Sequence, residues 1–334
     1  MRRWIIAACC VAGSTAAIVA PAQPTPGADA PKSAGYPTRT VRLLIPFPAA
    51  GTADTLARGV GQKLSEFYNQ ALVMDNRPGA GGNLATEIAA KSKPDGYTLV
   101  IATPGPFAAN VTLQAGKLPF DPARDFEPIS LLARSPLILV THPSIPVRSI
   151  AELLRLAKSR PGELNYATPG NGTANHLVME TFNKVAGIRI THIPFKGTAQ
   201  SLVALLGGDI ELLMGQIPST RAQIAAGRVR ALALSGTHRS QVLPAVPTFA
   251  ESGVRGVEAT SWYGVAAPSG TPADIVRRLA ADIAKAVASQ DLRAKYVTEG
   301  VEPETNSPAE FSAFIRAEVT RWGKAVKDAG ITAN

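Results

Sequence analysis

Short apolar segments of β-strand type alternate with glycine-containing turns and amphipathic helices along this 334-residue chain. Residues 41–45 are apolar except for Arg42 and end at Pro46, and apolar residues then recur at helical spacing up to Leu64. The first five predicted elements are a strand at 41–45, a helix at 52–67, a strand at 71–74, a helix at 83–91 that Asn83 caps, and a strand at 97–102. This βαβαβ order predicts a parallel sheet covered by helices, with ligand sites just past the carboxyl ends of the strands.

A second set of strands and helices follows the apolar stretch 131–140, which Pro136 breaks and which suits a crossing between two lobes. The set consists of strands at 164–167, 188–194, 210–214 and 229–235 and of helices at 149–159, 173–185, 198–206 and 219–226. Residues 261–267 then return as a strand. Two C-terminal helices are each opened by a hydroxyl cap and a proline, at Thr271-Pro272 and Ser307-Pro308. Two α/β lobes joined by two crossings form a cleft whose walls can close on a small ligand.

The N-terminus has the layout of an export signal. Two arginines precede the apolar residues 4–20, and small residues follow at Ala20 and Ala22, the positions that a signal peptidase reads. We therefore expect cleavage before Gln23 and release into the periplasm. Lipid attachment at Cys9 is an alternative, although it would leave an apolar segment too short for a signal peptide. Retention of the segment as a membrane anchor is the other alternative.

These features divide the chain into five predicted parts. They are a signal peptide at 1–22, a flexible Pro-, Ala- and Gly-rich tether at 23–35, the first part of lobe 1 at 36–135, lobe 2 at 136–240, and a return segment with C-terminal helices at 241–334. The last part completes lobe 1, so the chain visits lobe 1, lobe 2 and then lobe 1 again.

The chain carries a formal charge of +9, which falls to +7 when the two arginines of the signal peptide are removed. Nucleic-acid binding needs clustered lysine and arginine with interleaved aromatic residues, whereas the basic residues here are dispersed. We therefore exclude nucleic acid as a partner and interpret the charge as a solvated surface with a cationic bias. A weak field that draws anions toward a cleft is the alternative interpretation.

The sequence contains no motif for catalysis or for metal binding. The four histidines lack the spacing of a metal site, and both cysteines lie within the first ten residues. There is no Gly-x-Ser-x-Gly elbow and no P-loop, and the two glycine-rich turns that begin like a dinucleotide fingerprint do not complete it. We therefore predict that the protein is not an enzyme and that it holds neither a metal nor a cofactor.

Three glycine-containing turns that lead into helices are the candidate binding elements, at residues 46–54, 78–83 and 168–173. Free backbone amides and the positive end of the helix dipole suit a carboxylate or a phosphate. The first and third turns occupy equivalent strand-to-helix positions in opposite lobes, which favours both as sites that face the cleft. The alternative is a tight turn without a ligand, and this interpretation is favoured for the second turn.

The candidate ligand-binding residues come from these two turns and from two positions beyond them. They are Phe47, Pro48, Ala49, Ala50, Gly51 and Asp54 in the first turn, Thr168, Gly170, Asn171, Gly172 and Thr173 in the third turn, and His176 and Lys196. For three of them a role other than ligand binding stays open. Asp54 could brace its own turn, His176 could pack in the core, and Lys196 could lie on the solvated surface.

Co-linear motifs in both lobes cover residues 36–331. They include Asn76-Arg-Pro-Gly-Ala-Gly-Gly-Asn83, Pro94-Asp-Gly-Tyr-Thr98, Leu118-Pro-Phe-Asp121, Gly170-Asn-Gly-Thr173 with His176, Pro194-Phe-Lys-Gly197 and Pro268-Ser-Gly-Thr-Pro272. With these motifs the chain resembles the periplasmic solute-binding receptors of tripartite tricarboxylate transporters, the TctC-like Bug family. The resemblance implies a two-lobe, Venus-flytrap α/β fold of the periplasmic-binding-protein type, in which each lobe is a mostly parallel sheet flanked by helices.

The resemblance also implies a function, which is to capture a small carboxylate between the lobes and to deliver it to the permease subunits in the membrane. Backbone groups of the first and third turns are expected to hold the carboxylate. We expect a monomer. An extracytoplasmic sensor subunit that signals to a membrane kinase and a secreted enzyme are the alternative functions.

Two departures from the family pattern bear on the ligand. The first turn, usually Pro-Gly-Gly, has Ala49-Ala50-Gly51 here, so a position that needs a positive φ is altered. Where many relatives carry an aspartate, this chain has Gly215-Gln216, and we add Gln216 to the candidate binding residues. Without that carboxylate an amino-acid ligand is disfavoured, and a ligand whose remaining part is uncharged or purely anionic is favoured.

The export signal predicts the N-terminus of the mature protein. N-terminal sequencing of protein from the periplasmic fraction should find Gln23 as the first residue. An acylated Cys9 or an intact Met1 would contradict this expectation.

Overall fold

The structure is a computed structural model that describes Met1 and residues 35–332. The predicted signal peptide, the cleavage before Gln23, the alternative lipid site at Cys9 and nearly all of the predicted tether lie outside the described residues. Within residues 35–332, no helix is both long enough and apolar enough to cross a membrane.

The first lobe is built on three parallel strands in the order β2-β1-β3. The elements of this part are β1 (Val41–Ile45), α1 (Thr52–Tyr68), β2 (Leu72–Asn76), the short helix η2 (Ala80–Gly82), α2 (Asn83–Ala90), β3 (Thr98–Ala102), the single-turn π-helix η3 (Gly105–Ala109) and α3 (Asn110–Leu113). Four of the five residues of β1 are buried, because helices cover both faces of this sheet. The predicted βαβαβ unit is confirmed.

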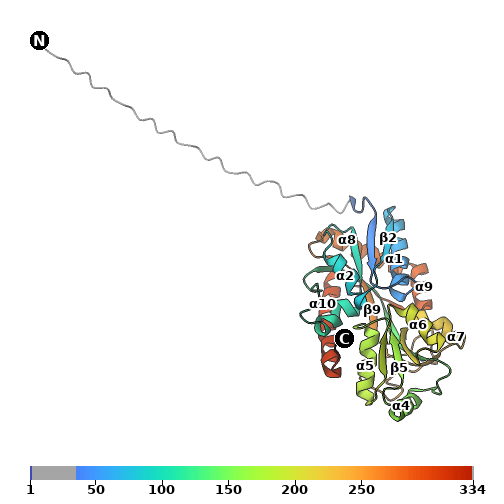
Figure 1. Ribbon diagram of the computed structural model, residues 1–334. Helices are drawn as coiled ribbons and strands as arrows, with labels where there is room; N and C mark the ends of the chain where they lie inside the picture. The colour runs from blue at the N-terminus through green and yellow to red at the C-terminus, as the bar shows by residue number, and fades with distance from the viewer. Residues whose placement is uncertain (2–34, 333–334) are drawn as a thin grey trace. The chain divides into compact units, whose positions relative to one another are not determined.

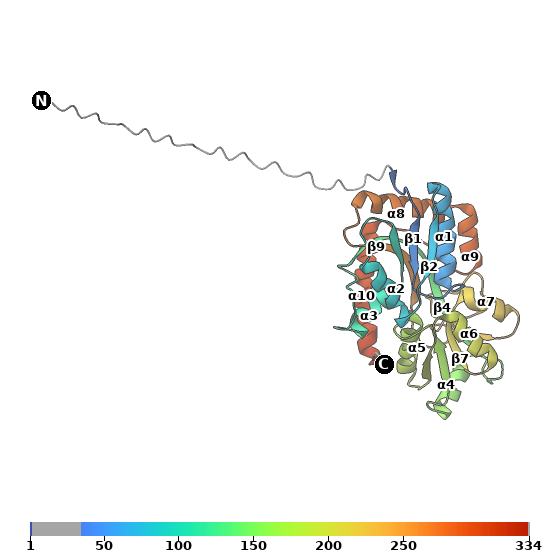
Figure 2. The same cartoon turned by 45° about the horizontal axis from the view of Figure 1, so that its top comes forward.

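The second lobe is built on another parallel unit, in the order β7-β5-β6. Its elements are α4 (Ile150–Ser159), β5 (Asn165–Thr168), α5 (Ala174–Ala186), β6 (Thr191–Pro194), α6 (Thr198–Gly207), β7 (Leu212–Gln216), α7 (Ile217–Ala225) and β8 (Arg230–Leu234). Figures 1 and 2 show α4 at the end of the molecule opposite α8, with α5 and α6 nearer the first lobe.

Two long antiparallel strands, β4 (Phe126–Thr141) and β9 (Thr260–Pro268), connect the two units. The first half of β4 pairs with β9, up to Pro136 opposite Thr260. From Leu137 onward β4 pairs with β7 and β8 of the second lobe. The proline therefore lies where β4 passes from one partner set to the other. The predicted two-lobe α/β fold is confirmed, and the crossing strands extend each parallel unit with antiparallel pairs.

The C-terminal part consists of α8 (Ala273–Ala288), α9 (Gln290–Thr298), β10 (Glu302–Pro303) and α10 (Pro308–Ala329). The hydroxyl cap predicted at Ser307 is confirmed. It is part of a capping box, since the Ser307 side chain accepts from the amide of Glu310 and the Glu310 side chain accepts from the amide of Ser307. The cap predicted at Thr271 is wrong: Pro272 occupies the N-cap position of α8, and the Thr271 hydroxyl instead donates to the Pro268 carbonyl at 2.7 Å.

The cap predicted at Asn83 is also wrong. Gly82, with a φ of 103°, occupies the N-cap position of α2, and Asn83 is already helical. The Asn83 side chain turns into the protein, where it donates to Gln114 at 3.0 Å and accepts from Asn110 at 2.8 Å.

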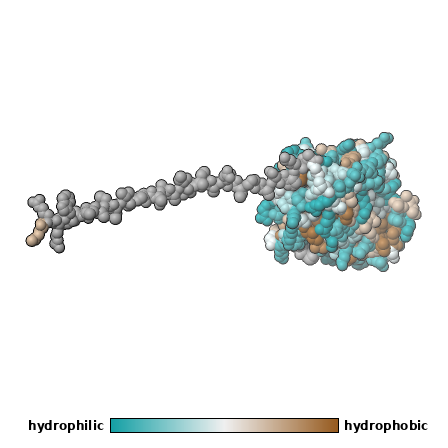
Figure 3. All heavy atoms as spheres, turned by 90° about the horizontal axis from the view of Figure 1, so that it is seen from above, coloured by the Kyte–Doolittle hydropathy of each residue, from teal (hydrophilic) through white to brown (hydrophobic). Residues whose placement is uncertain are grey.

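Separate hydrophobic cores stabilise the two lobes, and α10 contributes to the core of each. Phe311 and Ile315 pack beside β3 and β9, whereas Trp322 and Val326 pack with α5 of the second lobe. The residue boundaries of the lobes stay a prediction, and Phe249 in the second core shows that the segment after residue 240 still contributes to that lobe. On the face seen in Figure 3, hydrophilic residues predominate and hydrophobic residues form scattered spots.

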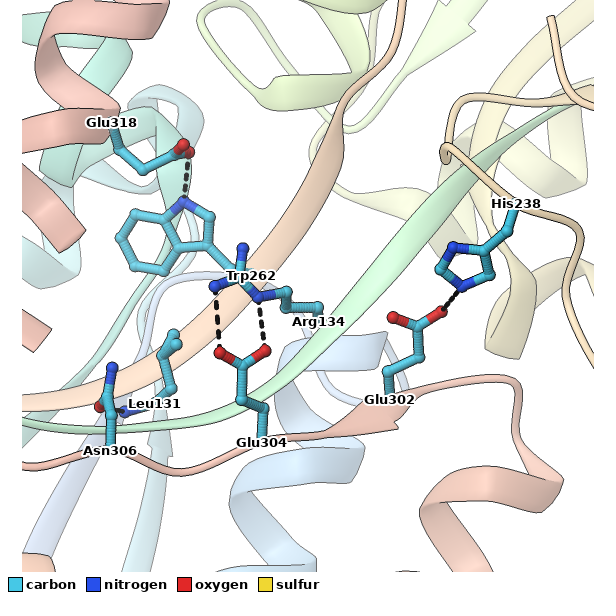
Figure 4. Close-up of polar contacts among 8 residues, drawn as sticks. All are labelled: Leu131, Arg134, His238, Trp262, Glu302, Glu304, Asn306 and Glu318. Atoms are coloured by element: carbon cyan, nitrogen blue, oxygen red, sulfur yellow. Dashed lines mark hydrogen bonds and ion pairs between the residues drawn. The ribbon is translucent and has the colours of Figure 1, made fainter. Parts of the chain in front are cut away.

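Polar contacts fix the C-terminal segment against the crossing strands (Figure 4). The guanidinium of Arg134 on β4 donates to both carboxylate oxygens of Glu304, at 2.6 and 3.0 Å. The carboxylate of Glu318 on α10 accepts from the indole N–H of Trp262 on β9 and from that of Trp322, both at 2.8 Å. Glu318 therefore joins α10 to β9, the strand that lies between β3 and β4 in the sheet.

Replacing Glu318 with leucine should destabilise the protein, because two buried indole N–H groups would lose their acceptor. We expect the free energy of unfolding to fall by about 2 kcal/mol or more in urea titrations. Arg321→Met is the control: it removes the half-exposed cation that pairs with Glu318 and lies over the Trp322 ring but leaves the acceptor for the indoles in place, and should cost less than about 1 kcal/mol. Equal losses in the two variants would contradict the role of Glu318 as an acceptor for the indoles.

Candidate functional site

A cavity lies where the carboxyl ends of the parallel strands of both lobes meet. It encloses about 530 Å³ of empty space, its mouth included. The lining residues follow β1, β3 and β5, end β7, begin α1, α5 and α6, or lie on β9. They are Phe47, Pro48, Ala49, Gly51, Thr52, Ala53, Thr103, Pro104, Gly105, Pro169, Thr173, Ala174, Asn175, Thr198, Ala199, Gln216, Ser261 and Tyr263. The sequence placed ligand sites at this end of the strands.

The structure brings some of the predicted binding residues to the cavity wall and leaves others behind it. Those on the wall are Phe47, Pro48, Ala49, Gly51, Thr173 and Gln216. Those not on the wall are Ala50, Asp54, Thr168, Gly170, Asn171, Gly172, His176 and Lys196. Lys196 is exposed, and its backbone amide donates to Gln200 at 3.2 Å.

The first two residues of three helices line the cavity: Thr52 and Ala53 of α1, Ala174 and Asn175 of α5, and Thr198 and Ala199 of α6. Amides in the first turn of a helix have no acceptor within the helix. The N-cap residues of α1 and α6 are glycines, which have no side-chain oxygen to cap these amides. Three helix N-termini therefore direct amide hydrogens and positive dipole ends at one cavity.

No side chain among the described residues that line the cavity carries a formal charge. Gln216 is held in a neutral network instead. Its Oε1 accepts from the Thr198 hydroxyl at 3.0 Å, and its Nε2 donates to the Asn175 Oδ1 at 3.2 Å. Asn175 in turn donates to the Met214 carbonyl at 2.8 Å. This network fixes three polar side chains of the second lobe without a carboxylate or a cation.

Hydroxyl groups complete the polar part of the wall. Burial raises the pKa of Tyr263 to about 12, so its hydroxyl keeps its proton at neutral pH and remains a donor. The hydroxyl of Thr103 is buried and has no hydrogen-bond partner among the residues that the structure describes. A buried hydroxyl without a partner at a cavity wall is suited to bonding a ligand or a water.

Sequence reasoning missed several of these residues. Thr103-Pro104-Gly105 follows β3 just as the first turn follows β1, so the strand-end rule itself was a signal that could have found them. Thr198 begins a predicted helix and Asn175 lies in the first turn of another, so both had the same signal. Ser261 and Tyr263 lie on the crossing strand β9, and only the register of that strand, which the sequence does not specify, brings them to the cavity.

Asp54 lies behind the first turn. Its carboxylate accepts from the amide of Ala50 at 2.9 Å, from Arg58 at 2.8 Å and from Asn76 at 3.0 Å. Burial alone would raise the pKa of Asp54, but these hydrogen bonds outweigh it and lower the pKa. Ala50 has a φ of 64°, so alanine adopts the left-handed conformation that the departure from Pro-Gly-Gly put in question.

His176 lies behind the third turn, in a stack of three aromatic rings. Its ring centroid is 4.2 Å from that of His192, which is 4.9 Å from that of Tyr166. Its Nδ1 accepts from the amide of Gly172 at 3.3 Å, and His192 hydrogen bonds with the Thr168 hydroxyl at 2.6 Å. Burial lowers the pKa of His176 to about 4, and burial together with His176 lowers that of His192 to about 3. Both rings are therefore neutral at neutral pH.

The residues that the structure describes contain no group of three or more His, Cys, Asp or Glu side chains that could hold a metal ion.

Comparisons with known proteins agree with the resemblance seen in the motifs. Residues 56–331 match the family model described as "Tripartite tricarboxylate transporter family receptor". Protein BugT of Bordetella pertussis is 36% identical over 308 residues, which are 92% of this chain and 94% of BugT. The structure of R. palustris Rpa4515 with adipate is 40% identical, with a TM-score of 0.86, and covers 89% of this chain and 99% of that one. The structure of MatC from Rhodopseudomonas palustris with malate is 31% identical, with a TM-score of 0.83, and covers 87% and 100%.

The histidine stack predicts how stability depends on pH. The unfolded chain protonates both histidines near pH 6.5, whereas the folded chain resists protonation until about pH 4 and about pH 3. The unfolded state therefore binds more protons below pH 6.5, and stability falls as the pH is lowered. Between pH 7 and pH 5 we expect a loss of about 2 kcal/mol per histidine.

Urea unfolding of the wild type and of His192→Phe at several pH values measures this loss. The variant should lose less stability than the wild type on acidification, whereas the control variant His142→Phe, away from the stack, should follow the wild type. If the free energy of unfolding fell equally with pH in the wild type and in His192→Phe, the acid sensitivity would not come from the histidine stack.

Proposed function

Because the chain belongs to the family of tripartite tricarboxylate transporter receptors, we propose that its cavity captures a small carboxylate between the lobes for delivery to the membrane permease. Receptors of this family are periplasmic. The export signal at residues 1–22 brings the chain to that compartment, where it acts as a monomer and releases its ligand chemically unchanged.

The observation that carries the proposal is the convergence of three helix N-termini on a cavity without charged side chains. Each N-terminus acts as about half of a positive charge, so the three together supply roughly one and a half charges. That amount suits an anion with one or two carboxylates. A buried anion without such partners would cost several kcal/mol to desolvate, which is why the amide donors are needed.

Within the cavity, the amides at the starts of α1 and α5 hold one carboxylate. The unpartnered hydroxyl of Thr103 and the protonated hydroxyl of Tyr263 are further donors. Phe47, Pro48 and Ala49 form an apolar side of the cavity that suits the carbon skeleton of the ligand. The predicted binding residues behind the wall, Asp54 and His176 among them, support the turns rather than the ligand.

The ligand carries no ammonium group. A buried ammonium group needs a carboxylate partner. Where such a carboxylate would stand in the wall, this chain has the neutral amide of Gln216, which hydrogen bonds with Thr198 and Asn175. Relatives of this chain have been solved with adipate and with malate, both of which are dicarboxylates without an amine. Dicarboxylates and simple monocarboxylates are therefore the first ligands to test.

Isothermal titration of the mature chain, residues 23–334, with adipate, malate and hexanoate tests the proposal. At least one of them should bind with a dissociation constant in the micromolar range or below. Adipamide, which has the shape of adipate but no charge, should bind at least about tenfold more weakly than adipate, and so should 2-aminoadipate. Failure of every carboxylate in a broader panel, or equal binding of adipate and adipamide, would contradict the proposal.

Gln216→Glu tests the location of the site with a change of nearly equal shape. The added negative charge should weaken binding of the preferred carboxylate at least about tenfold. Gln241→Glu adds the same charge on an exposed loop and should leave binding unchanged. Equal binding by both variants would place the ligand elsewhere.

A further inference from the structure

One peptide unit of the third turn spans the distance between His176 and the first lobe. The amide of Gly172 donates to His176 Nδ1 at 3.3 Å. The carbonyl of Asn171 belongs to the same peptide and lies against Gly81, where an added Cβ would be only 2.2 Å from that oxygen. In a trans peptide the N–H and the C=O point in opposite directions, so fixing one end fixes the other.

Gly172, the next residue of the turn, packs against the first lobe as closely as the Asn171 carbonyl does. A Cβ on Gly172 would lie 2.1 Å from the Asn110 Oδ1, and one on Gly105 would lie 3.0 Å from the Gly172 carbonyl. Gly172 has a φ of 72°, which glycine adopts readily. Backbone therefore meets backbone between the segments that follow β2, β3 and β5, with no space for side chains between them.

His176 is itself held firmly. His176 is only 6% exposed, and the stack with His192 and Tyr166 fixes the plane of its ring. The Tyr166 hydroxyl at the end of the stack donates to Glu180 at 2.5 Å. The acceptor for the Gly172 amide is therefore placed by α5 and β5, and not by the turn.

We propose that His176 is a positioning residue for lobe closure: its Nδ1 orients the Asn171–Gly172 peptide so that the turn seats on Gly81 and Asn110 of the first lobe. This inference rests on the proposed function, because it concerns closure around the same ligand. It also explains why His176 lies close to the cavity and yet is absent from its wall.

Loss of the acceptor would leave the buried amide of Gly172 without a partner. The peptide would then rotate toward another acceptor, which moves the Asn171 carbonyl off Gly81. Since closure contributes to ligand affinity, we expect about tenfold weaker binding, the effect of one unmade hydrogen bond.

Two substitutions at position 176 separate this role from a packing role. His176→Asn places its Oδ1 where Nδ1 lies and keeps an acceptor, whereas His176→Leu removes the acceptor but keeps an apolar side chain. Three measurements are compared with the wild type: hydrogen exchange of the Gly172 amide without ligand, adipate affinity, and the decrease in radius of gyration on adding adipate.

We expect the Gly172 amide to exchange slowly in the wild type and in His176→Asn, and fast in His176→Leu. Adipate affinity should stay within about threefold for His176→Asn and fall about tenfold for His176→Leu, with a smaller contraction. Gly81→Ala, which strikes the Asn171 carbonyl, should also reduce contraction. Gly116→Ala should not, because it adds a methyl group at a similar positive φ but with nothing within 4 Å.

The inference is overturned if the Gly172 amide exchanges equally slowly in His176→Leu, or if both variants at 176 melt lower but bind and contract like the wild type. If the wild type does not bind adipate, the carboxylate that binds in the titrations above takes its place in these measurements. If no carboxylate binds, the proposed function is wrong, and the exchange of the Gly172 amide alone decides the role of His176.

Discussion

The antiparallel pairing of β4 with β9 determines where every other part of the cavity lies. Both strands pass between the two parallel units, and β4 exchanges β9 for β7 and β8 at Pro136. This arrangement directs the carboxyl ends of β1 and β3 toward those of β5 and β7. The turns and helix starts that follow these strands then meet at one place, and Tyr263 on β9 closes the cavity from the side of the crossing strands.

In the function proposed above, the cavity recognises an anion without charged side chains in its wall. Arginine or lysine at the wall would attract a carboxylate more strongly, but would also have to be desolvated each time the lobes close. Helix N-termini and fixed amides are already oriented in the ligand-free protein, so closure requires little reorganisation. Such amides bind a carboxylate less strongly than a buried cation would, which suits a receptor that must also release its ligand. On the same proposal the neutral wall disfavours an ammonium group, because Gln216 offers no carboxylate to pair with it.

Much of the fold could be predicted from the sequence, because strand, turn and helix patterns are local. The site could be predicted only in part. The glycine turns were recognised, but neighbouring residues of one turn face different ways: in the third turn Gly172 faces Asn110 of the first lobe, whereas Thr173 lines the cavity. Which side faces the ligand depends on the packing of one lobe against the other. The cap at Asn83 failed for a related reason, since tertiary hydrogen bonds to Gln114 and Asn110 took its side chain. At Thr271 a local hydrogen bond to the Pro268 carbonyl took the hydroxyl instead.

The central claim is that backbone amides at helix starts hold the ligand's carboxylate, and diffraction from crystals of the mature chain with its preferred carboxylate tests it most directly. We predict carboxylate oxygens within about 3 Å of amide nitrogens in the first turns of α1 and α5, with no arginine or lysine side chain in contact. A carboxylate bound instead by a cationic side chain such as Lys196, or bound outside this cavity, would contradict the account.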